Sequence, residues 1–259
     1  MRNLLVVLEY DGTDLCGLQR QSNGLTVQEV VEDALCRLTE APTKITAAGR
    51  TDAGVHAHAQ VINFFTASRI PVPRWPAALN SVLPRNVAAS QALEVPAEFH
   101  ARKCVHSKTY LYRVLNRATR SPLEERFALL CTTPLELGSM REAMRSLLGK
   151  HDFSAFARRE AGDQRSPVRT MLRADCWREG DLVNLLLQAD GFLYRMARSI
   201  VGTLLEVGGG ARTPGEVDRL LHTGERARAG ATAPPQGLFL AQVEYRCPHL
   251  QACFGRMFP

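Results

Sequence analysis

Several common functional signatures are missing from this sequence, and their absence narrows the possible classes of protein. No apolar run approaches the roughly 18 to 20 residues that a helix needs to cross a bilayer. The seven cysteines are scattered, and no two of them form a CxxC pair, which argues against both a disulfide framework and a zinc site. The apolar residues 4–8 are too few for a signal peptide and lead directly into Glu9, without a small-residue cleavage site. We therefore expect an N-terminal strand, no membrane association, no bound metal and a cytoplasmic location.

Motifs of the large enzyme classes are also missing. The chain contains no HExxH, no GxSxG and no GxxxxGK[ST]. The glycine-rich residues 202–210 lack the strand, loop and helix order of a dinucleotide fold. These absences argue against zinc proteases, serine hydrolases of the nucleophile-elbow type, P-loop enzymes and dinucleotide-dependent enzymes.

The composition is that of an ordinary globular protein with an excess of positive charge. Of 259 residues, 45% are hydrophobic and 22% are charged, and the formal net charge is +6. A basic balance of this size is a moderate indication of a polyanionic partner such as a nucleic acid.

Hydrophobic periodicity predicts the same order of elements twice along the chain. In the first half we expect strands at 3–10, 45–48, 60–65 and 87–95, with a helix after Thr26 and another ended by Pro84. Thr26 and Glu29 have the spacing of a capping box at the start of that first helix. In the second half we expect strands at 107–115, 171–177, 182–188 and 238–245, with helices at 140–148, 192–207 and after Thr213. Strand, helix, strand, strand, helix, strand is the ferredoxin-like order, so the sequence predicts an α+β protein with antiparallel sheets. The predicted boundary between the halves gives domains at 1–103 and 104–259.

Two loops carry residues that could take part in chemistry. Residues 49–57, GRTDAGVHA, place Arg50, Asp52 and His56 among glycines between two predicted strands. A glycine–aspartate turn without chemistry is the simpler interpretation of that segment. Residues 157–169 carry Arg158, Arg159, Arg165 and Arg169, either as a solvated loop or as an arm that gathers phosphates.

Short segments that carry a family resemblance follow one another in order over nearly the whole sequence. They are Tyr10-Asp11-Gly12 with Gly17, Gln19 and Gln21, Thr26-Val27-Gln28, Phe99-His100-Ala101-Arg102, Tyr110 with Tyr112, His151-Asp152-Phe153, Pro167-Val168-Arg169-Thr170, Gly191-Phe192-Leu193 with Met196 and Arg198, Gly202-Thr203-Leu204-Leu205, and Pro235 through Gly237 to Leu240. Together with residues 49–57, which match the family signature essentially throughout, these segments resemble the tRNA pseudouridine synthase A family. So many ordered matches make chance similarity implausible.

The resemblance implies a role for each matching site residue. Asp52 matches the catalytic aspartate, and Arg50 matches the arginine that helps to displace the target base. Tyr110 matches the tyrosine that stacks on the base, Arg198 the basic partner of the aspartate, and Leu238 an apolar residue that lines the pocket. The reaction that the resemblance implies, the isomerisation of uridine to pseudouridine, has no redox step and releases no atom, so no cofactor is expected.

The family's other properties become expectations of the same kind. They are uridine at tRNA positions 38 to 40 as substrate, a homodimer that binds tRNA, and two halves sharing an extended antiparallel sheet with flanking helices, with Asp52 in the cleft between them. This chain departs from the family pattern at Arg195, where Asn or His is usual, and at Leu18, where an aromatic residue is common. The alternatives are a non-catalytic RNA-binding or RNA-folding protein, which needs no nucleophile, and an aspartate-dependent hydrolase, for which a second carboxylate or a metal site is lacking.

Overall fold

The chain divides into two compact units in the computed structural model, which describes residues 1–158 and 166–246. One unit contains residues 1–106 together with the last strand from Phe239 on, and the other contains residues 107–238. Each unit combines strands with helices, so the predicted α+β class is confirmed. The predicted division at 103/104 stays a prediction, because compactness does not test which part of the chain folds alone.

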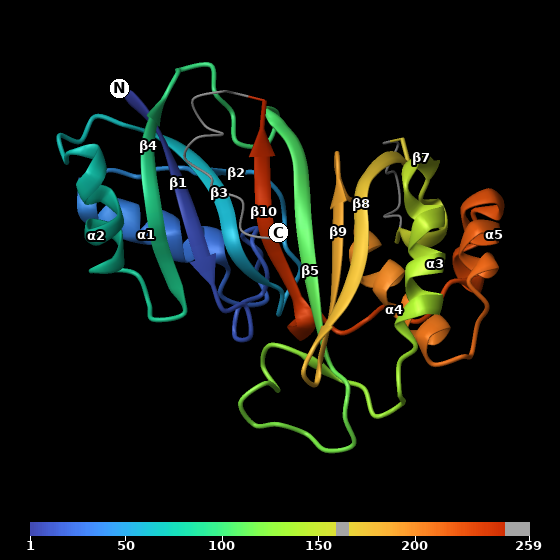
Figure 1. Cartoon of the computed structure of the whole chain (residues 1–259). Coiled ribbons are helices and arrows are strands. Elements are labelled where there is room, and N and C mark those ends of the chain that lie inside the picture. The colour runs from blue at the N-terminus through green and yellow to red at the C-terminus, as the bar shows by residue number, and fades with distance from the viewer. Residues whose placement is uncertain (159–165, 247–259) are drawn as a thin grey trace. The chain divides into compact units, whose positions relative to one another are not determined.

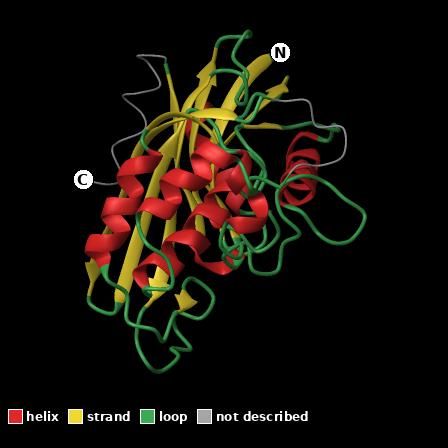
Figure 2. Ribbon diagram, turned by 90° about the vertical axis from the view of Figure 1, so that its right-hand side faces the viewer, coloured by secondary structure: helices red, strands yellow, loops and turns green. Residues whose placement is uncertain are grey.

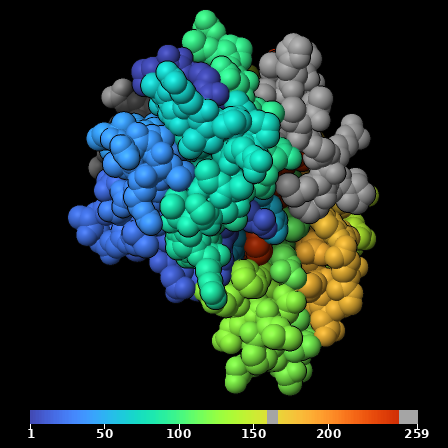
Figure 3. All heavy atoms as spheres, turned by 90° about the vertical axis from the view of Figure 1, so that its left-hand side faces the viewer, coloured from blue at the N-terminus to red at the C-terminus, as the bar shows by residue number. Residues whose placement is uncertain are grey.

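The first unit is a sheet with the strand order β4-β1-β3-β10, with β2 added beside β3 (Figure 1). Its elements are β1 (Arg2–Tyr10), α1 (Val27–Thr39), β2 (Thr46–Ala47), β3 (His56–Thr66), α2 (Trp75–Asn80), β4 (Val87–Val95) and β10 (Leu238–Tyr245). Strand β1 lies in the middle and pairs antiparallel with both β3 and β4. Its residues Leu4 to Leu8 are almost wholly buried, as expected for an apolar run in a central strand. The atoms of α1 (blue) and of α2 with its flanking loops (cyan to green) lie side by side on the face shown in Figure 3.

Helix α1 begins where the sequence predicts, but its cap differs in one detail. The hydroxyl of Thr26 accepts a hydrogen bond from the backbone N–H of Glu29 at 3.3 Å, which is half of a capping box. The carboxylate of Glu29 was expected to bond back to the backbone N–H of Thr26; it accepts instead from Arg20 at 3.0 Å. Arg20 therefore ties the loop before the helix to the first turn of the helix.

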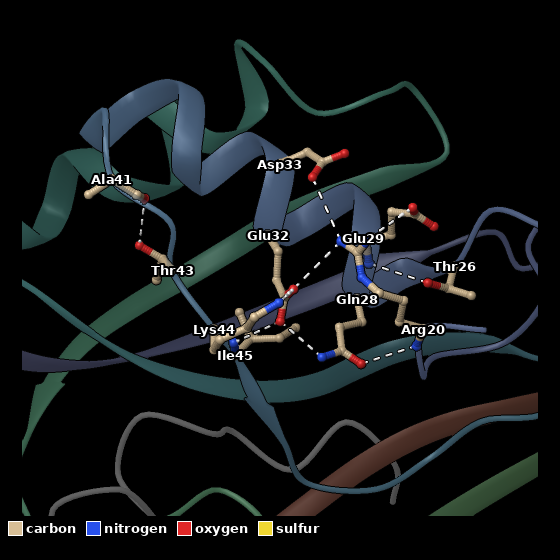
Figure 4. Close-up of polar contacts among 10 residues, drawn as sticks. All are labelled: Arg20, Thr26, Gln28, Glu29, Glu32, Asp33, Ala41, Thr43, Lys44 and Ile45. Carbon is tan, nitrogen blue, oxygen red and sulfur yellow. Dashed lines mark hydrogen bonds and ion pairs between the residues drawn. The ribbon is translucent and has the colours of Figure 1, made fainter. Parts of the chain in front are cut away.

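A buried carboxylate fixes α1 to the segment that leads into β2 (Figure 4). Glu32 accepts hydrogen bonds from Lys44 at 2.9 Å, from Gln28 at 2.9 Å and from the backbone N–H of Ile45 at 3.3 Å. Burial by itself raises the pKa of Glu32, but these hydrogen bonds and the charge of Lys44 together hold the pKa below its ordinary value. The start of the chain segment that carries Asp52 is thereby anchored to the helix.

The second unit is a sheet with the strand order β5-β9-β8-β7, with β6 beside β5. Its elements are β5 (Val105–Leu115), β6 (Leu129–Leu130), α3 (Leu137–Leu147), β7 (Gly149–Asp152), β8 (Val168–Glu179), β9 (Leu182–Ala189), α4 (Met196–Gly208) and α5 (Gly215–Thr223). Helix α3 packs against β8, α4 and α5, and Figure 2 shows red helices in front of the yellow strands there. The apolar face of α3 supplies Met140, Ala143, Met144 and Leu147 to the core.

Two expectations about elements need correction. Two short pairings are parallel, β10 with β3 and β5 with β6, although antiparallel sheets were expected. The helix expected at 192–207 begins only at Met196, because Arg195 adopts left-handed backbone angles, φ 61° and ψ 8°, that a helix cannot continue through. Among the described residues, no helix is long and apolar enough to cross a membrane.

Candidate active site

Asp52 lies in a tight loop that connects β2 to β3 in the first unit. The backbone N–H of Val55 bonds to the carbonyl of Asp52 at 3.2 Å, and Gly54 has a φ of 76°. The chain therefore turns at Asp52 before it enters the buried strand. The side chain of Asp52 is half-buried, whereas its neighbour Thr51 is buried. This geometry leaves Asp52 partly accessible at the end of a well-packed strand.

The segment before α1 holds this loop in place through backbone hydrogen bonds. The N–H of Leu18 bonds to the carbonyl of Thr51 at 3.1 Å, and the N–H of Gly54 bonds to the carbonyl of Leu15 at 3.2 Å. The hydroxyls of Tyr10 and Thr51 lie 2.8 Å apart in the interior. Burial raises the pKa of Tyr10 to about 12, although hydrogen bonds with Thr51 and Gln60 oppose the rise. The phenol is therefore a neutral structural group near neutral pH.

Two glycines make this close contact possible. A Cβ at Gly12 would lie 2.1 Å from the carbonyl oxygen of Val55. A Cβ at Gly17 would lie 2.6 Å from the carbonyl oxygen of Thr51, and Gly17 also has a φ of +80°. Any larger residue would push the 10–18 segment away from the Asp52 loop. The sequence contained this signal as two glycines in matching motifs, but it did not show that both of them contact one loop.

Two side chains to which the sequence assigned no chemical role also support the loop. The amide of Gln60 donates to the carbonyl of Gly49 at 2.9 Å and fixes the start of the loop. Nδ1 of the buried His56 lies 3.1 Å from the backbone N of Gly12 and 3.2 Å from Oδ1 of Asp11. The His56 ring also stacks on Phe239 of β10, with centroids 4.8 Å apart. We interpret His56 and Gln60 as positioning residues.

Arg50 lies beside a polar pocket of about 290 Å³ within the first unit. The pocket lining includes Arg50, Arg102, His100, Gln19 and Leu18. Arg50 and Arg102 are exposed, so both guanidinium groups can meet an incoming anion. Leu18, one of the two departures from the family pattern, also lines this pocket. Two cationic side chains with neighbouring amides suit the phosphates and sugar edges of a polynucleotide.

Tyr110 and Phe192 form an aromatic pair in the second unit. Tyr110 is buried on β5, and its ring meets that of Phe192 edge to face, with centroids 4.8 Å apart. Tyr112, two residues along the strand, donates its hydroxyl to the carbonyl of Pro234 at 2.8 Å. Burial raises the pKa of Tyr112, and the charge of Arg198 partly opposes this rise. The positive charge of Arg198 therefore lies close enough to act on the Tyr112 hydroxyl.

Arg198 is anchored to the segment that leads into the last strand. Its Nε donates to the carbonyl of Ala233 at 2.7 Å, and the N–H of Ala233 bonds to the carbonyl of Arg198 at 3.0 Å. Leu238 begins β10 and is 5% exposed. The candidate site residues thus form two sets, Asp52 and Arg50 in the first unit and Tyr110, Arg198 and Leu238 in the second. That the two sets build one site stays a prediction.

Part of the predicted phosphate-gathering loop lies outside the described residues. Arg159 and Arg165 fall in that part of the loop. Cys247 and Cys253, near the end of the chain, also lie outside the described residues. Of the described arginines in the loop, Arg169 donates to the carbonyls of Ser166 at 2.8 Å and Val168 at 2.6 Å. Among the described residues there is no group of three or more His, Cys, Asp or Glu side chains that could hold a metal ion.

The comparisons with known proteins agree with one another. The family model described as tRNA pseudouridine synthase matches residues 6–102 and 143–246. The chain therefore belongs to the tRNA pseudouridine synthase family, and the expectation of an isomerase of this family is confirmed.

Individual relatives carry the narrower name tRNA pseudouridine synthase A. The chain is 43% identical to tRNA pseudouridine synthase A 2 of Clostridium perfringens (strain 13 / Type A), over 95% of this chain and 100% of that one. It is 42% identical to the tRNA pseudouridine synthase A of Thermoanaerobacter sp. (strain X514), again over 95% and 100%. The tRNA pseudouridine synthase A of Halalkalibacterium halodurans is 43% identical over 92% of this chain and 90% of its own length.

Proposed function

We propose that this enzyme converts uridine to pseudouridine in the anticodon stem-loop of tRNA, at positions 38 to 40, with Asp52 as the nucleophile. The observation that carries the proposal is the construction of the Asp52 loop. Asp52 is half-buried in the loop between β2 and β3. The backbone of this loop is supported by Tyr10, by Gln60 and by the close approach of two glycines. A plain surface turn needs no such support, whereas a nucleophile has to be held close to its reactive geometry.

The chemistry begins with removal of the target base from the stack. Arg50 is exposed beside its pocket, so it can enter the space that the base leaves and can bind a neighbouring phosphate. Tyr110 supplies an aromatic face for the extruded uracil, and Leu238 an apolar wall.

Asp52 then forms a covalent bond to the nucleotide, either at C6 of the uracil ring or at C1′ of the sugar. The N-glycosidic bond breaks, the uracil rotates, and C5 takes the place of N1 on the sugar. The proton released from C5 returns to the ring at N1, so no atom is lost and no electron donor or acceptor takes part. Arg198 stabilises the carboxylate when it leaves again.

The remaining family properties complete the proposal. We place the enzyme in the cytoplasm as a homodimer that binds tRNA, with no cofactor. In this proposal the Asp52 set and the Tyr110 set act on the same target nucleotide, as the sequence resemblance implies.

The test is Asp52→Asn, which preserves shape and removes the nucleophile. We expect normal folding, normal tRNA affinity and no detectable pseudouridine at positions 38 to 40 when modified sites are mapped in purified tRNA. Asp33→Asn is the matched control, because Asp33 is an exposed aspartate of the same unit on α1 and lies outside the loop. Its activity should equal that of the wild type.

Three other outcomes would contradict the proposal. Pseudouridine formation by Asp52→Asn within about tenfold of the wild-type rate, roughly 1.4 kcal/mol in barrier height, would exclude nucleophilic catalysis by Asp52. Joint loss of tRNA binding and activity would make Asp52 a structural residue. Tight tRNA binding by a wild type that forms no pseudouridine would favour an RNA-binding or RNA-folding protein.

A further inference from the structure

A second basic pocket lies within the second unit, and none of the residues with a role in the proposed chemistry lines it. It has a volume of about 780 Å³, which falls in the range of small-ligand sites, ~300–1,000 Å³. Its lining includes Arg158, Arg195, Arg226, Ser154 and Thr232. We call it the arginine pocket. Three guanidinium groups and two hydroxyl groups form a donor set that suits a phosphate group.

The three arginines of the pocket are not neutralised by carboxylates in the part of the chain that the structure describes. Arg226 is held by neutral groups, with Nη2 2.9 Å from Oγ1 of Thr232 and 3.3 Å from Oγ of Ser199. Glu225, its neighbour in sequence, pairs with Arg228 instead. Like charges that share a pocket repel one another, so the arrangement is most stable with an anion between them.

Arg195 is held in the pocket in an unfavourable conformation. Its backbone is left-handed at φ 61°, a conformation that disfavours a side chain with a Cβ. Its Nε is buried and has no hydrogen-bond partner among the described residues, and a buried donor without a partner destabilises the folded state. Asn or Gly would fit the backbone better. Strain together with an unsatisfied buried donor points to a ligand that the side chain has to meet.

We propose that the arginine pocket binds a backbone phosphate of the tRNA close to the target nucleotide. The location follows from the start of α4: Arg195 directly precedes the helix, and Arg198 lies in its first turn. Arg198 donates to the carbonyl of Ala233, the residue next to Thr232 of the pocket, and it is the proposed partner of the catalytic carboxylate. The arginine that departs from the family pattern thus adds a phosphate contact beside the reaction centre. The inference rests on the proposed function, because it takes tRNA as the ligand.

The decisive variant is Arg195→Asn, since asparagine tolerates the left-handed backbone and the fold should remain intact. We expect KM for tRNA to rise about tenfold with kcat nearly unchanged, because a phosphate contact binds substrate and transition state alike. The slope of log affinity against log salt should fall in magnitude by about 0.7 to 0.9 for one lost phosphate contact. Arg145→Gln is the matched control: Arg145 is exposed in the last turn of α3, outside the pocket, and the net charge changes by the same single unit.

The binding measurements are made in the Asp52→Asn background, so they do not depend on turnover. If Arg195→Asn matches Arg145→Gln in both affinity and salt slope while the wild type forms pseudouridine, the pocket assignment is wrong and the proposed function stands. If the wild type binds tRNA without forming pseudouridine, the proposed function is wrong, and the same binding comparison still decides the role of the pocket.

A second arm separates RNA phosphate from a free phosphorylated molecule. Inorganic phosphate is titrated against the protein at constant ionic strength, with chloride as the balancing anion. Competition between phosphate and tRNA that disappears in Arg195→Asn supports the RNA assignment. Phosphate binding that depends on Arg195, combined with unchanged tRNA affinity, would instead make the pocket a site for a small phosphorylated ligand and would overturn the proposal.

Discussion

Gly17→Ala tests whether the contact between the 10–18 segment and the Asp52 loop controls catalysis. An added Cβ would lie 2.6 Å from the carbonyl oxygen of Thr51 and 3.1 Å from the backbone N of Ala53, whereas ordinary contact begins near 3.4 Å. Both neighbours are backbone atoms, so they cannot rotate away as a side chain would. The loop that carries Asp52 would have to shift by most of an ångström.

The expected magnitude has two parts. The left-handed φ of +80° costs an alanine ~1–2 kcal/mol, partly offset by ~0.4–1 kcal/mol from a stiffer unfolded chain. Overpacking against the carbonyl of Thr51 adds ~1–3 kcal/mol. A net loss of roughly 2–4 kcal/mol lowers Tm by roughly 5–15 °C for a chain of this size. Misplacing a catalytic group by about an ångström costs about 100-fold in rate.

Gly210→Ala is the matched control for this prediction. Gly210 has nearly the same φ, +78°, but nothing lies within 4 Å of its added Cβ. The control therefore carries the backbone strain without the clash, and it should lose about 1 kcal/mol or less and keep full activity. The assay is thermal unfolding together with the rate of pseudouridine formation for both variants. Equal stability losses in the two variants, with unchanged rates, would refute the reasoning about loop position.

Three further predictions follow from the other contacts. Tyr110→Phe should retain most tRNA affinity because the ring face is kept, while Tyr110→Ala should lose about 1 to 3 kcal/mol of base stacking; full activity in both variants would assign Tyr110 to the core. Glu32→Gln should lower the free energy of unfolding by about 1–3 kcal/mol at pH 7, because a buried, hydrogen-bonded carboxylate loses its ionic contact with Lys44. Because the pKa of Glu32 is lowered in the folded state, its contribution to the free energy of unfolding is complete above the unfolded pKa, near 4.3, and disappears as the pH falls through the folded pKa. A stability difference between the variant and the wild type that stays constant in acid would contradict the ionic origin. Activity on pre-folded tRNA should survive thorough chelation of the protein, and the finding of a stoichiometric bound zinc lost together with activity would overturn that prediction.

The sequence by itself determined the local elements and the candidate nucleophile. Apolar periodicity located α1, and Thr26 fixed its first turn through a cap that needs only four consecutive residues. The alternating and buried runs located β1 and β9 for the same reason, since strand and helix periods are local properties of the chain. Asp52 was found through an ordered set of motifs, whose agreement over the chain does not depend on knowing any contact.

Contacts between distant segments were decided only by the tertiary structure. The parallel pairing of β10 with β3 joins residues about 180 positions apart, and no local pattern encodes a partner at that separation. The Asp52 loop is positioned by Tyr10, Gly17 and Gln60, whose roles depend on the register between β1 and β3. The left-handed backbone of Arg195 shortened a helix that periodicity had extended to residue 192, because a single dihedral angle ends a helix without changing its apolar pattern. The arginine pocket likewise collects side chains from separate turns, and such a convergence exists only once the chain has folded.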